Sequence, residues 1–339
     1  MGIMDSTPAR TATASDLPAP TPQELTALST DALLVALPDA GVLTLAGEDR
    51  VDFLHGQVAN DVRGLPPGGT NTTLLLNHKG HALAQLRVLR GEELIITLVE
   101  DGAIDLVEES LESHIIFDQV TLGRRPDLRA FTLQGGRAGE ILTAALGPGV
   151  LPAPGHYSEL AGAAGAAGRV LVVPARRSEA GGFDLLTEAD DAAAITGALR
   201  AAGAAEGSRA ALDLARVCAG IASAAGEGGE GVLPQEAGLE EYLSYRKGCY
   251  LGQEIMARIE ARGNMRRGLS ALRLDGPPQP GERDITLDGR RVGRLGTAAL
   301  HPAAGPVALA VLRNDLPEGA EVEVGGVRAR PVTLPLALA

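Results

Sequence analysis

The sequence predicts an α+β fold followed by an all-β module. Up to about residue 200, patterns typical of strands and of helices alternate, which favours a mixed sheet with helices packed on it. From Leu269 the pattern changes to short strands at regular spacing, and the dipeptides Asp288-Gly289 and Gly325-Gly326 are strong hairpin signals. We therefore expect residues 269–339 to form a small antiparallel β-barrel or sandwich behind an α+β body.

The first part of the chain supplies the alternation. Apolar residues at helical spacing predict a helix over 22–37, and similar patterns predict helices over 51–58 and 103–114. Short apolar runs predict strands at 41–45, 71–76, 83–89 and 94–99. The sequence Asn77-His78-Lys79-Gly80-His81 is expected to be the turn between two of these strands.

The middle of the chain has weaker patterns. The run AGAAGAAG at 161–168 predicts a flexible surface loop. Strands are expected at 169–173 and 183–186, and an alanine-rich helix at 189–202. Cys218 lies in an apolar helical run, LDLARVCAGIA, and is predicted to be a core residue.

Composition excludes several classes of protein. The net charge is −13, with four Tyr, four Phe and no Trp, which argues against a nucleic-acid-coating or base-stacking surface. Two cysteines make no disulfide framework, and no apolar run approaches the roughly 18 residues of a membrane span. Residues 1–24 are predicted to be a disordered tail without signal-peptide features. We expect a cytoplasmic protein with no membrane and no stable nucleic-acid partner.

Two motif-like stretches are given a structural interpretation. GEGGEG at 226–231 fits G-x-G-x-x-G, but it has no preceding strand or following helix, so we expect an acidic flexible loop instead of a dinucleotide site. His55, His78 and His81 lack carboxylate or thiolate partners at ligand spacing. No metal site is predicted.

The segment 242–273 is locally basic, with seven basic and two acidic residues. A helix is expected at 253–262, in which Arg258 and Arg262 are i,i+4 neighbours on one face. Two guanidinium groups on one face suit a carboxylate or phosphate. A solvated basic helix face is the alternative.

Cys249 comes just before this helix and two residues after Lys247. A helix N-terminus and a nearby cation both stabilise a thiolate. Cys249 is therefore a candidate nucleophile, metal ligand or redox thiol, and the spacing alone leaves these roles and a buried structural role open.

Residues 247–254, KGCYLGQE, resemble the K-G-C-[FY]-x-G-Q-E signature of the YgfZ family, relatives of the glycine-cleavage T protein. The blocks at 45–65 and 74–89 also agree with the family. Weaker matches are GFDLL at 182–186 and RVCAGI at 216–221, where Ala222 replaces the usual proline. The resemblance covers about 30–339.

The resemblance implies a T-protein-like body of ferredoxin-like lobes around a central folate pocket, plus a C-terminal antiparallel β-barrel. The implied domains are 25–264, with two lobes that divide near 125–165, and 265–339. It also implies a tetrahydrofolate-binding protein that supports assembly or repair of iron–sulfur enzymes, including tRNA-modifying ones. Folate or a one-carbon derivative is the implied cofactor, and iron–sulfur client or assembly proteins are the implied partners, with transient contact to a cluster.

Site residues follow from the same resemblance. Cys249 is the functional thiol and Lys247 its neighbour at the reactive loop. The residues expected to hold folate, with Asp184 on the pterin and the arginines on the anionic end, are Asn77, Lys79, Asp184, Arg216, Tyr250, Gln253, Glu254, Arg258 and Arg262.

Two alternatives stay open. The T protein is an aminomethyltransferase with an essential carboxylate after the Asn-x-x-Gly turn, but Ala84 and Gln85 stand at these positions here. That disfavours a divergent aminomethyltransferase unless Asp61 or Asp184 substitutes. The other alternative is a non-catalytic folate-sensing scaffold. Whether the chain is an enzyme is left undecided.

The two lysines provide one further expectation. Of the 30 basic residues only Lys79 and Lys247 are lysines, and both precede a glycine within blocks that match the family. A compact ammonium differs from the planar fork of arginine. We therefore expect the loops that carry Lys79 and Lys247 to meet at the pocket.

Overall fold

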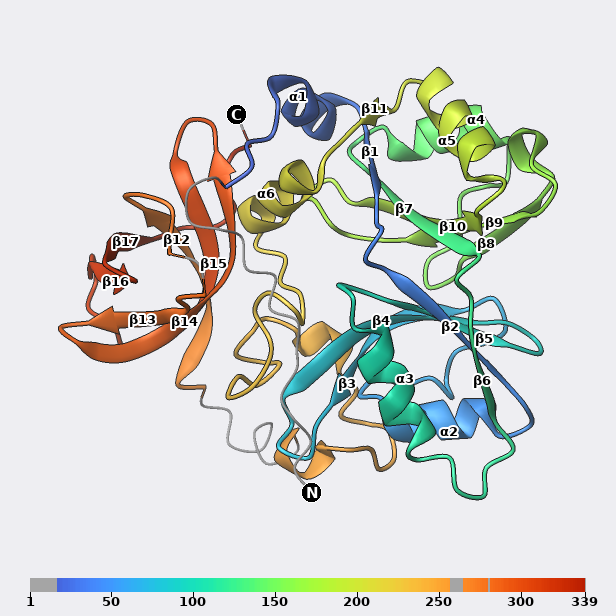
Figure 1. The fold of residues 1–339 in the computed structure, drawn as a ribbon, viewed down its shortest axis with the longest axis horizontal. Helices are drawn as coiled ribbons and strands as arrows, with labels where there is room; N and C mark the ends of the chain where they lie inside the picture. Colours follow the sequence, from blue (N-terminus) through green and yellow to red (C-terminus); the bar gives the residue numbers. More distant parts are fainter. Residues whose placement is uncertain (1–16, 257–264, 280, 339) are drawn as a thin grey trace.

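The computed structural model describes residues 17–256, 265–279 and 281–338. Two sheets with flanking helices form the body, and a closed barrel lies beside them (Figure 1). The predicted α+β body with an antiparallel C-terminal barrel is confirmed. Within the described residues, no helix is long and apolar enough to cross a membrane.

The first sheet has five strands in the order β3-β4-β5-β2-β6. Their bounds are β2 (Gly41–Ala46), β3 (Thr70–Leu76), β4 (Ala82–Arg90), β5 (Ile95–Val99) and β6 (Thr121–Arg124). Helices α2 (Arg50–Gln57) and α3 (Ile104–Glu112) cover one face, where Phe53 and Leu111 pack into the same buried cluster as Leu43. The predicted strands and helices of this region are confirmed within a few residues.

The second sheet has six strands in the order β11-β1-β7-β10-β9-β8. Their bounds are β1 (Leu33–Ala36), β7 (Leu128–Gln134), β8 (Ser158–Ala161), β9 (Arg169–Pro174), β10 (Gly182–Glu188) and β11 (Ala205–Glu206). One face packs on the first sheet, with Val173 and Leu186 against Leu98. Helices α4 (Ala138–Leu146) and α5 (Ala192–Ala201) cover the other face. The body is therefore a four-layer arrangement of helices, sheet, sheet and helices.

The predicted helix over 22–37 is wrong in its second half. Helix α1 (Pro22–Thr30) starts at a capping box between Thr21 and Glu24 and ends at Thr30, so residues 22–24 belong to the body and not to the tail. The apolar run 33–36 is instead strand β1, paired with β7 and β11. Because a strand covered on both faces is apolar throughout, its leucines imitate the spacing of a helix. The tail predicted for residues 1–16 lies outside the described residues.

The surface loop predicted for 161–168 is confirmed as a largely exposed connection between β8 and β9, although two of its alanines face inward. Ala163 and Ala166 are buried in the cluster beneath α4 and α5, and a short 3-10 turn, η1 (Ala163–Gly165), lies between them. Small side chains therefore allow close packing here. Elements β6, β7 and α4 were not predicted. After β6 the chain passes from the first sheet back to the second at residues 125–127.

The C-terminal module is a closed barrel with the strand order β12-β15-β14-β13-β16-β17. The strands are β12 (Arg267–Leu274), β13 (Asp284–Leu287), β14 (Arg290–His301), β15 (Gly305–Arg313), β16 (Val322–Val324) and β17 (Val327–Val332). Both predicted hairpins are present. Asp288 and Gly289 have φ of 50° and 72°, and Gly325 and Gly326 have φ of 54° and 81°, the left-handed conformations that two-residue hairpin turns require.

Helix α6 (Arg209–Ala219) connects the body to the barrel. Its Leu214, Val217 and Cys218 pack against Val307 and Leu309 of the barrel. Cys218 is a core residue as predicted, and its burial raises the pKa of the thiol to about 12. The last residues of the chain cover the same helix, because the Leu336 amide donates to the Cys218 carbonyl at 2.8 Å.

The stretch GEGGEG is a structural joint and not a flexible acidic loop. Glu227 is fully buried, and its carboxylate pairs with Arg216 of α6 at 3.2 Å. The same carboxylate accepts from the amides of Ser223 and Thr297 at 2.8 Å each, so it ties α6 to the barrel. Glu230, three residues later, is exposed and lies 3.7 Å from Lys79.

The two glutamates of this hexapeptide make a matched test. Glu227→Ala leaves the buried Arg216 guanidinium without a counter-charge at one end, so we expect a loss of about 3–5 kcal/mol in the free energy of unfolding. Glu230→Ala, at an exposed pair, should change it by less than about 0.5 kcal/mol. Urea denaturation followed by circular dichroism measures both. Equal losses would contradict the role given to Glu227.

Candidate functional site

Basic side chains gather around a small cavity where the two sheets meet the segment after α6. Its volume is about 20 Å³, which is room for one water molecule or two. The residues that line it are Gln85, Arg87, Glu100, Arg176, Arg177, Arg216, Ile221, Ala222, Ser223 and Tyr242. Four arginines and one carboxylate line the cavity, and three of these arginines have carboxylates beside them, which leaves Arg176 as the positive charge without one among the described residues.

Arg177 fills the space between two buried carboxylates. Its guanidinium donates to both oxygens of Asp184, at 2.9 and 2.8 Å, and to both oxygens of Glu100, at 3.1 and 2.9 Å. Burial alone would raise the pKa of Asp184, but the charge of Arg177 and then of Arg87 holds it below its usual range. The same two carboxylates outweigh the burial of Arg177 and raise its pKa well above the ordinary value. Asp184 and Arg177 therefore both stay charged.

A second series of ion pairs starts at the adjacent residue, Asp101. Arg209 of α6 pairs with Asp101 at 2.9 Å and with Asp213 at 2.8 Å. Arg216 continues the series, 3.6 Å from Asp213 and 3.2 Å from Glu227. Glu100 and Asp101 directly follow strand β5. Through these ion pairs Glu100 holds the second sheet and Asp101 holds α6.

Two cationic groups of the cavity retain unused bonding capacity. The Nε of Arg87 is buried without a hydrogen-bond partner, since the nearest carboxylate oxygen, on Asp184, lies 3.6 Å away. Arg176 is exposed and forms no ion pair with any described residue. Burial, with Glu241 and Glu100 nearby, raises the pKa of Tyr242 to about 12, so its hydroxyl remains a proton donor. The free donors suit an anionic or acceptor-rich ligand.

The structure places Asp184, the residue expected on the pterin, behind Arg177. The Asp184 side chain is fully buried on β10, both oxygens are bound by Arg177, and it does not line the cavity. Asp61, the other proposed substitute carboxylate, is on a different loop, where its Oδ1 accepts from the Gly64 amide at 2.9 Å. Gln85 does line the cavity, and its Oε1 accepts from the Ala224 amide at 3.4 Å. An amide therefore stands in the wall where the aminomethyltransferase alternative needs a carboxylate.

Lys247 is an anchor and not a free catalytic cation. Its ammonium donates to the carbonyl oxygens of His55 and Val58, at the end of α2, and to that of Asn60 at 3.2 Å. These three acceptors use its three N–H groups. The ammonium also lies 4.7 Å from the centre of the Tyr250 ring. Burial, helped by Arg63, lowers the pKa of Lys247 to about 8.

The loops of the two lysines meet as expected, but not at the cavity, which neither loop lines. A side chain on Gly252, which has a φ of +85°, would come within 2.9 Å of the Asn77 carbonyl, and one on Gly80 within 2.7 Å of Met256. The turn itself is closed by Asn77, whose Oδ1 accepts from the amides of Lys79 and His81 at 2.9 and 3.0 Å. Asn77 is thus a turn former, and the Lys79 side chain is exposed beside Glu230.

Cys249 is exposed at the tip of this region. Gln253 supports its loop, because its Nε2 donates to the Lys247 carbonyl at 3.4 Å. The predicted helix does start at Gln253 and is described as far as Met256, where Glu254 is exposed. Arg258 and Arg262 lie outside the described residues.

The predicted folate site is therefore divided between two places. Arg216 lines the cavity, whereas Asn77, Lys79, Lys247, Cys249, Tyr250, Gln253 and Glu254 belong to the converging loops and do not line it. One hydrophobic cluster joins the two places. It contains Ala222 and Tyr242 from the cavity wall together with Tyr250 and Met256 from the loops.

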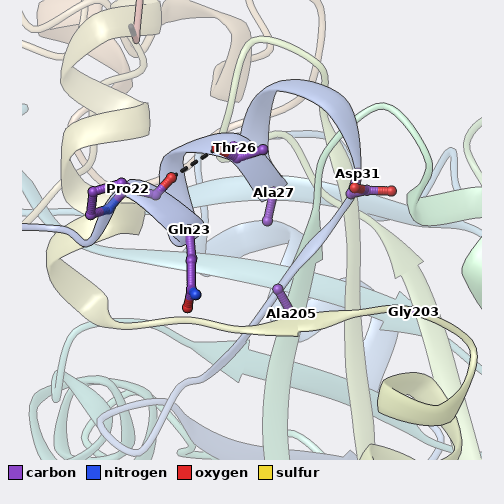
Figure 2. A pocket seen from close by; sticks show the side chains of 7 residues that line it. All are labelled: Pro22, Gln23, Thr26, Ala27, Asp31, Gly203 and Ala205. Atoms are coloured by element: carbon purple, nitrogen blue, oxygen red, sulfur yellow. Dashed lines mark hydrogen bonds between the residues drawn. The ribbon is translucent and has the colours of Figure 1, made fainter.

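A larger hollow, of about 300 Å³, lies between α1 and the β11 segment (Figure 2). Two of its three polar side chains already have partners, and Gln23 is the third. The Thr26 hydroxyl donates to the Pro22 carbonyl at 2.9 Å, and Asp31, the one charged residue in its wall, pairs with Arg137 at 2.6 Å. No polar groups converge on this hollow, so the cavity between the sheets is the stronger candidate site.

Arg87, Glu100, Arg176, Arg177 and Tyr242 were not predicted as site residues. A weak signal did exist in the chain, since Glu100-Asp101 directly follows the predicted strand at 94–99 and Arg176-Arg177 lies between the predicted strands at 169–173 and 183–186. Charged pairs at strand ends often mark a site at a sheet edge. Their pairing across 77 residues has no local pattern that reveals it.

Comparison with known proteins agrees with this architecture. The family described as "GCVT N-terminal domain" matches residues 12–247, and "CAF17, C-terminal beta-barrel domain" matches residues 266–336. The chain belongs to the GCVT N-terminal domain family. The resemblance to YgfZ proteins is supported by relatives named "tRNA-modifying protein YgfZ", to which the chain is similar over most of its length. The one from Yersinia enterocolitica is 28 % identical over 294 residues, which is 84 % of this chain and 85 % of the relative.

Further members of this family support the assignment. The YgfZ protein of Klebsiella pneumoniae is 27 % identical over 311 residues, 88 % of this chain and 92 % of the relative. The fold is that of the glycine cleavage system aminomethyltransferase T from Bartonella henselae, with a TM-score of 0.79 at 19 % identity over 96 % of this chain and 94 % of that protein. The predicted T-protein-like body is thus confirmed as a fold.

The two lysines of this family member provide a second matched test. Lys247→Arg places a larger planar group among three carbonyls, so we expect a loss of about 1–3 kcal/mol in the free energy of unfolding. Lys79→Arg, at an exposed position, should stay within about 0.5 kcal/mol of the unchanged protein. Urea denaturation measures both variants. If Lys247→Arg leaves the free energy of unfolding unchanged, an arginine can serve as the anchor as well as a lysine.

Proposed function

We propose that the chain binds tetrahydrofolate or a one-carbon derivative and supports tRNA modification by maintaining iron–sulfur enzymes. The observation that carries the proposal is the arginine-lined cavity between the two sheets, with the unpartnered Nε of Arg87 in its wall and Arg176 at its exposed side. The membership in a family with relatives named as tRNA-modifying proteins supports the biological context.

The donor set of the cavity fits a folate. The carbonyl oxygen of a pterin ring can accept from the buried Nε of Arg87, and the exposed Arg176 is available to the carboxylates at the distant glutamate end. The amino-pyrimidine ring of a pterin presents N–H donors, for which Glu100 is the carboxylate in the wall. The bound folate would supply a one-carbon unit or a place to receive one. The residues of this chain bind and orient it and keep its polar groups paired.

Space for this ligand requires Arg177 to move. A cavity of about 20 Å³ is far smaller than the roughly 300 Å³ or more of ordinary ligand pockets. Arg177 occupies the volume between Glu100 and Asp184, on the short connection between β9 and β10. Its withdrawal would expose both carboxylates at once. We therefore regard Arg177 as the residue that a folate replaces.

Aminomethyl transfer is the less favoured activity. Gln85 cannot act as a base or hold a charged amine as a carboxylate does. Asp184 is neutralised by Arg177, and Asp61 is held in its own loop by the Gly64 amide. Glu100 is the one carboxylate among the described lining residues, and it is also paired with Arg177. A role without aminomethyl chemistry, in which folate binding regulates another event, agrees better with this wall.

Cys249 is the group that we propose for contact with the iron–sulfur client. It is exposed, on a loop fixed by Lys247 and Gln253, and its loop shares a hydrophobic cluster with the cavity wall. A fixed, exposed thiol can approach a cluster or a thiol on another protein. Because the chain has a net charge of −13, we place the tRNA on the client enzyme and not on this chain.

Folate binding is tested by calorimetry. Tetrahydrofolate should bind the unchanged protein, and Arg176→Ala should weaken binding about 10-fold or more, as expected for loss of a charged hydrogen bond. Arg290→Ala removes an exposed arginine from the barrel and should leave the affinity unchanged. If tetrahydrofolate does not bind the unchanged protein, the proposed function fails.

The role of the thiol is tested in cells that lack the chain. Cys249→Ala should abolish restoration of thiolated tRNA, while its affinity for tetrahydrofolate and its unfolding midpoint stay unchanged, because the exposed thiol contributes little to packing. Arg246→Ala, three residues away and also exposed, is the control and should restore the modification fully. Full restoration by Cys249→Ala would exclude a functional thiol.

A further inference from the structure

The loop between α3 and β6 holds two large apolar side chains in solvent. Ile116 is 73 % exposed and Phe117 is 96 % exposed. The loop protrudes at the edge of the first sheet, below α3 and α2 in the view of Figure 1. Two adjacent apolar residues at a protruding tip form a compact apolar surface that the chain itself does not cover.

The backbone on both sides of this tip is fixed. The Gln119 amide donates to Asp49 at 2.7 Å, and the Gln119 carbonyl lies so close to Gly47, with its φ of +107°, that a side chain there would come within 1.9 Å. Ile115 and Val120 pack on the buried cluster beneath the sheet. The tip is therefore presented by an anchored loop, which lowers the entropic cost of binding through it.

Exposure of Phe117 contrasts with the use of phenylalanine elsewhere in the chain. The chain has four phenylalanines. Phe53 is buried, and Phe131 and Phe183 pack against the cluster beneath α4 and α5. Aromatic side chains that project into solvent from a fixed backbone are typical anchors of protein interfaces.

Acidic residues surround the tip. Glu109, Glu112 and Asp118 are exposed, and none of them forms an ion pair with a described residue. The neighbouring Arg124 is already paired with Asp105 at 2.6 Å and with Glu108. The surface around Ile116 and Phe117 is thus negative, which opposes binding to nucleic acid or to an anionic membrane.

We propose that Ile116 and Phe117 insert into an apolar pocket of another protein whose rim carries lysine or arginine residues. The apolar tip would supply the buried contact, and Glu109, Glu112 and Asp118 would face the basic rim. This surface is separate from the cavity and from the Cys249 loop, since none of its residues lines the cavity or belongs to the cluster that joins them. The inference does not depend on folate binding.

The partner is identified by photo-crosslinking with the full chain in the cells that produce it. Phe117→p-benzoylphenylalanine places the probe at the tip, and Leu151→p-benzoylphenylalanine, at a half-exposed apolar residue on another loop, is the matched control. We expect one major protein adduct at 117 and not at 151. Mass spectrometry should place the crosslink in an apolar pocket flanked by lysine or arginine.

The identified partner is then purified and its affinity measured with the unchanged chain. Phe117→Ser should weaken binding at least about 10-fold, and Glu112→Lys should weaken it at low salt but much less at high salt. Leu151→Ser should leave the affinity unchanged. Unchanged melting curves of all variants show that the fold is intact.

Several results would overturn the proposal. They are the absence of any adduct at 117, an adduct only with lipid, nucleic acid or a second copy of this chain, and equal adducts at 117 and 151. An affinity of Phe117→Ser for the purified partner equal to that of the unchanged chain would also overturn the proposal. Because Phe117 does not contact the cavity, tetrahydrofolate affinity is measured in parallel and separates a failure here from a failure of the proposed function.

Discussion

The structure depends on a network of charges that starts at two adjacent residues, Glu100 and Asp101. Glu100 binds Arg177 and so holds the second sheet, while Asp101 binds Arg209 and so holds α6. From α6 the network continues through Arg216 to the barrel. Buried charges are costly unless all are paired, so these elements have one arrangement that satisfies every partner. The network fixes the positions of the sheets, α6 and the barrel relative to one another more than it adds to the free energy of unfolding. The cavity lies within this network.

Prediction from the sequence succeeded where the determinants are local. The hairpins at Asp288-Gly289 and Gly325-Gly326 require backbone conformations that few other residues adopt, and these turns fix the barrel strands beside them. The meeting of the Lys79 and Lys247 loops was also predicted, because a residue type used only twice is informative. Prediction failed at 33–36, where an apolar strand between two neighbours imitates a helix, and it missed Glu100 and Arg177, whose pairing is set by tertiary structure. Roles of Arg258 and Arg262 stay predictions.

The motif at 247–254 and the cavity act as one unit through packing. Lys247 joins the motif loop to the end of α2, and Gly252 permits its contact with the turn at Asn77. The cluster behind this loop contains Tyr242 and Ala222, which also form part of the cavity wall. A rearrangement at Arg177 that moves Tyr242 would therefore reach the Cys249 loop through close-packed side chains, which transmit displacements because they leave little free volume.

Strand β1 has a consequence for the order in which the chain can fold. It contains residues 33–36, but its partners are β7, at 128–134, and β11, at 205–206. The first sheet is complete once residue 124 is available, whereas the second sheet cannot close before residue 206. During synthesis, the first sheet can form early while β1, at its N-terminal side, waits unpaired. Pairings of such high sequence separation form slowly, so we infer that docking of β1 completes the body late.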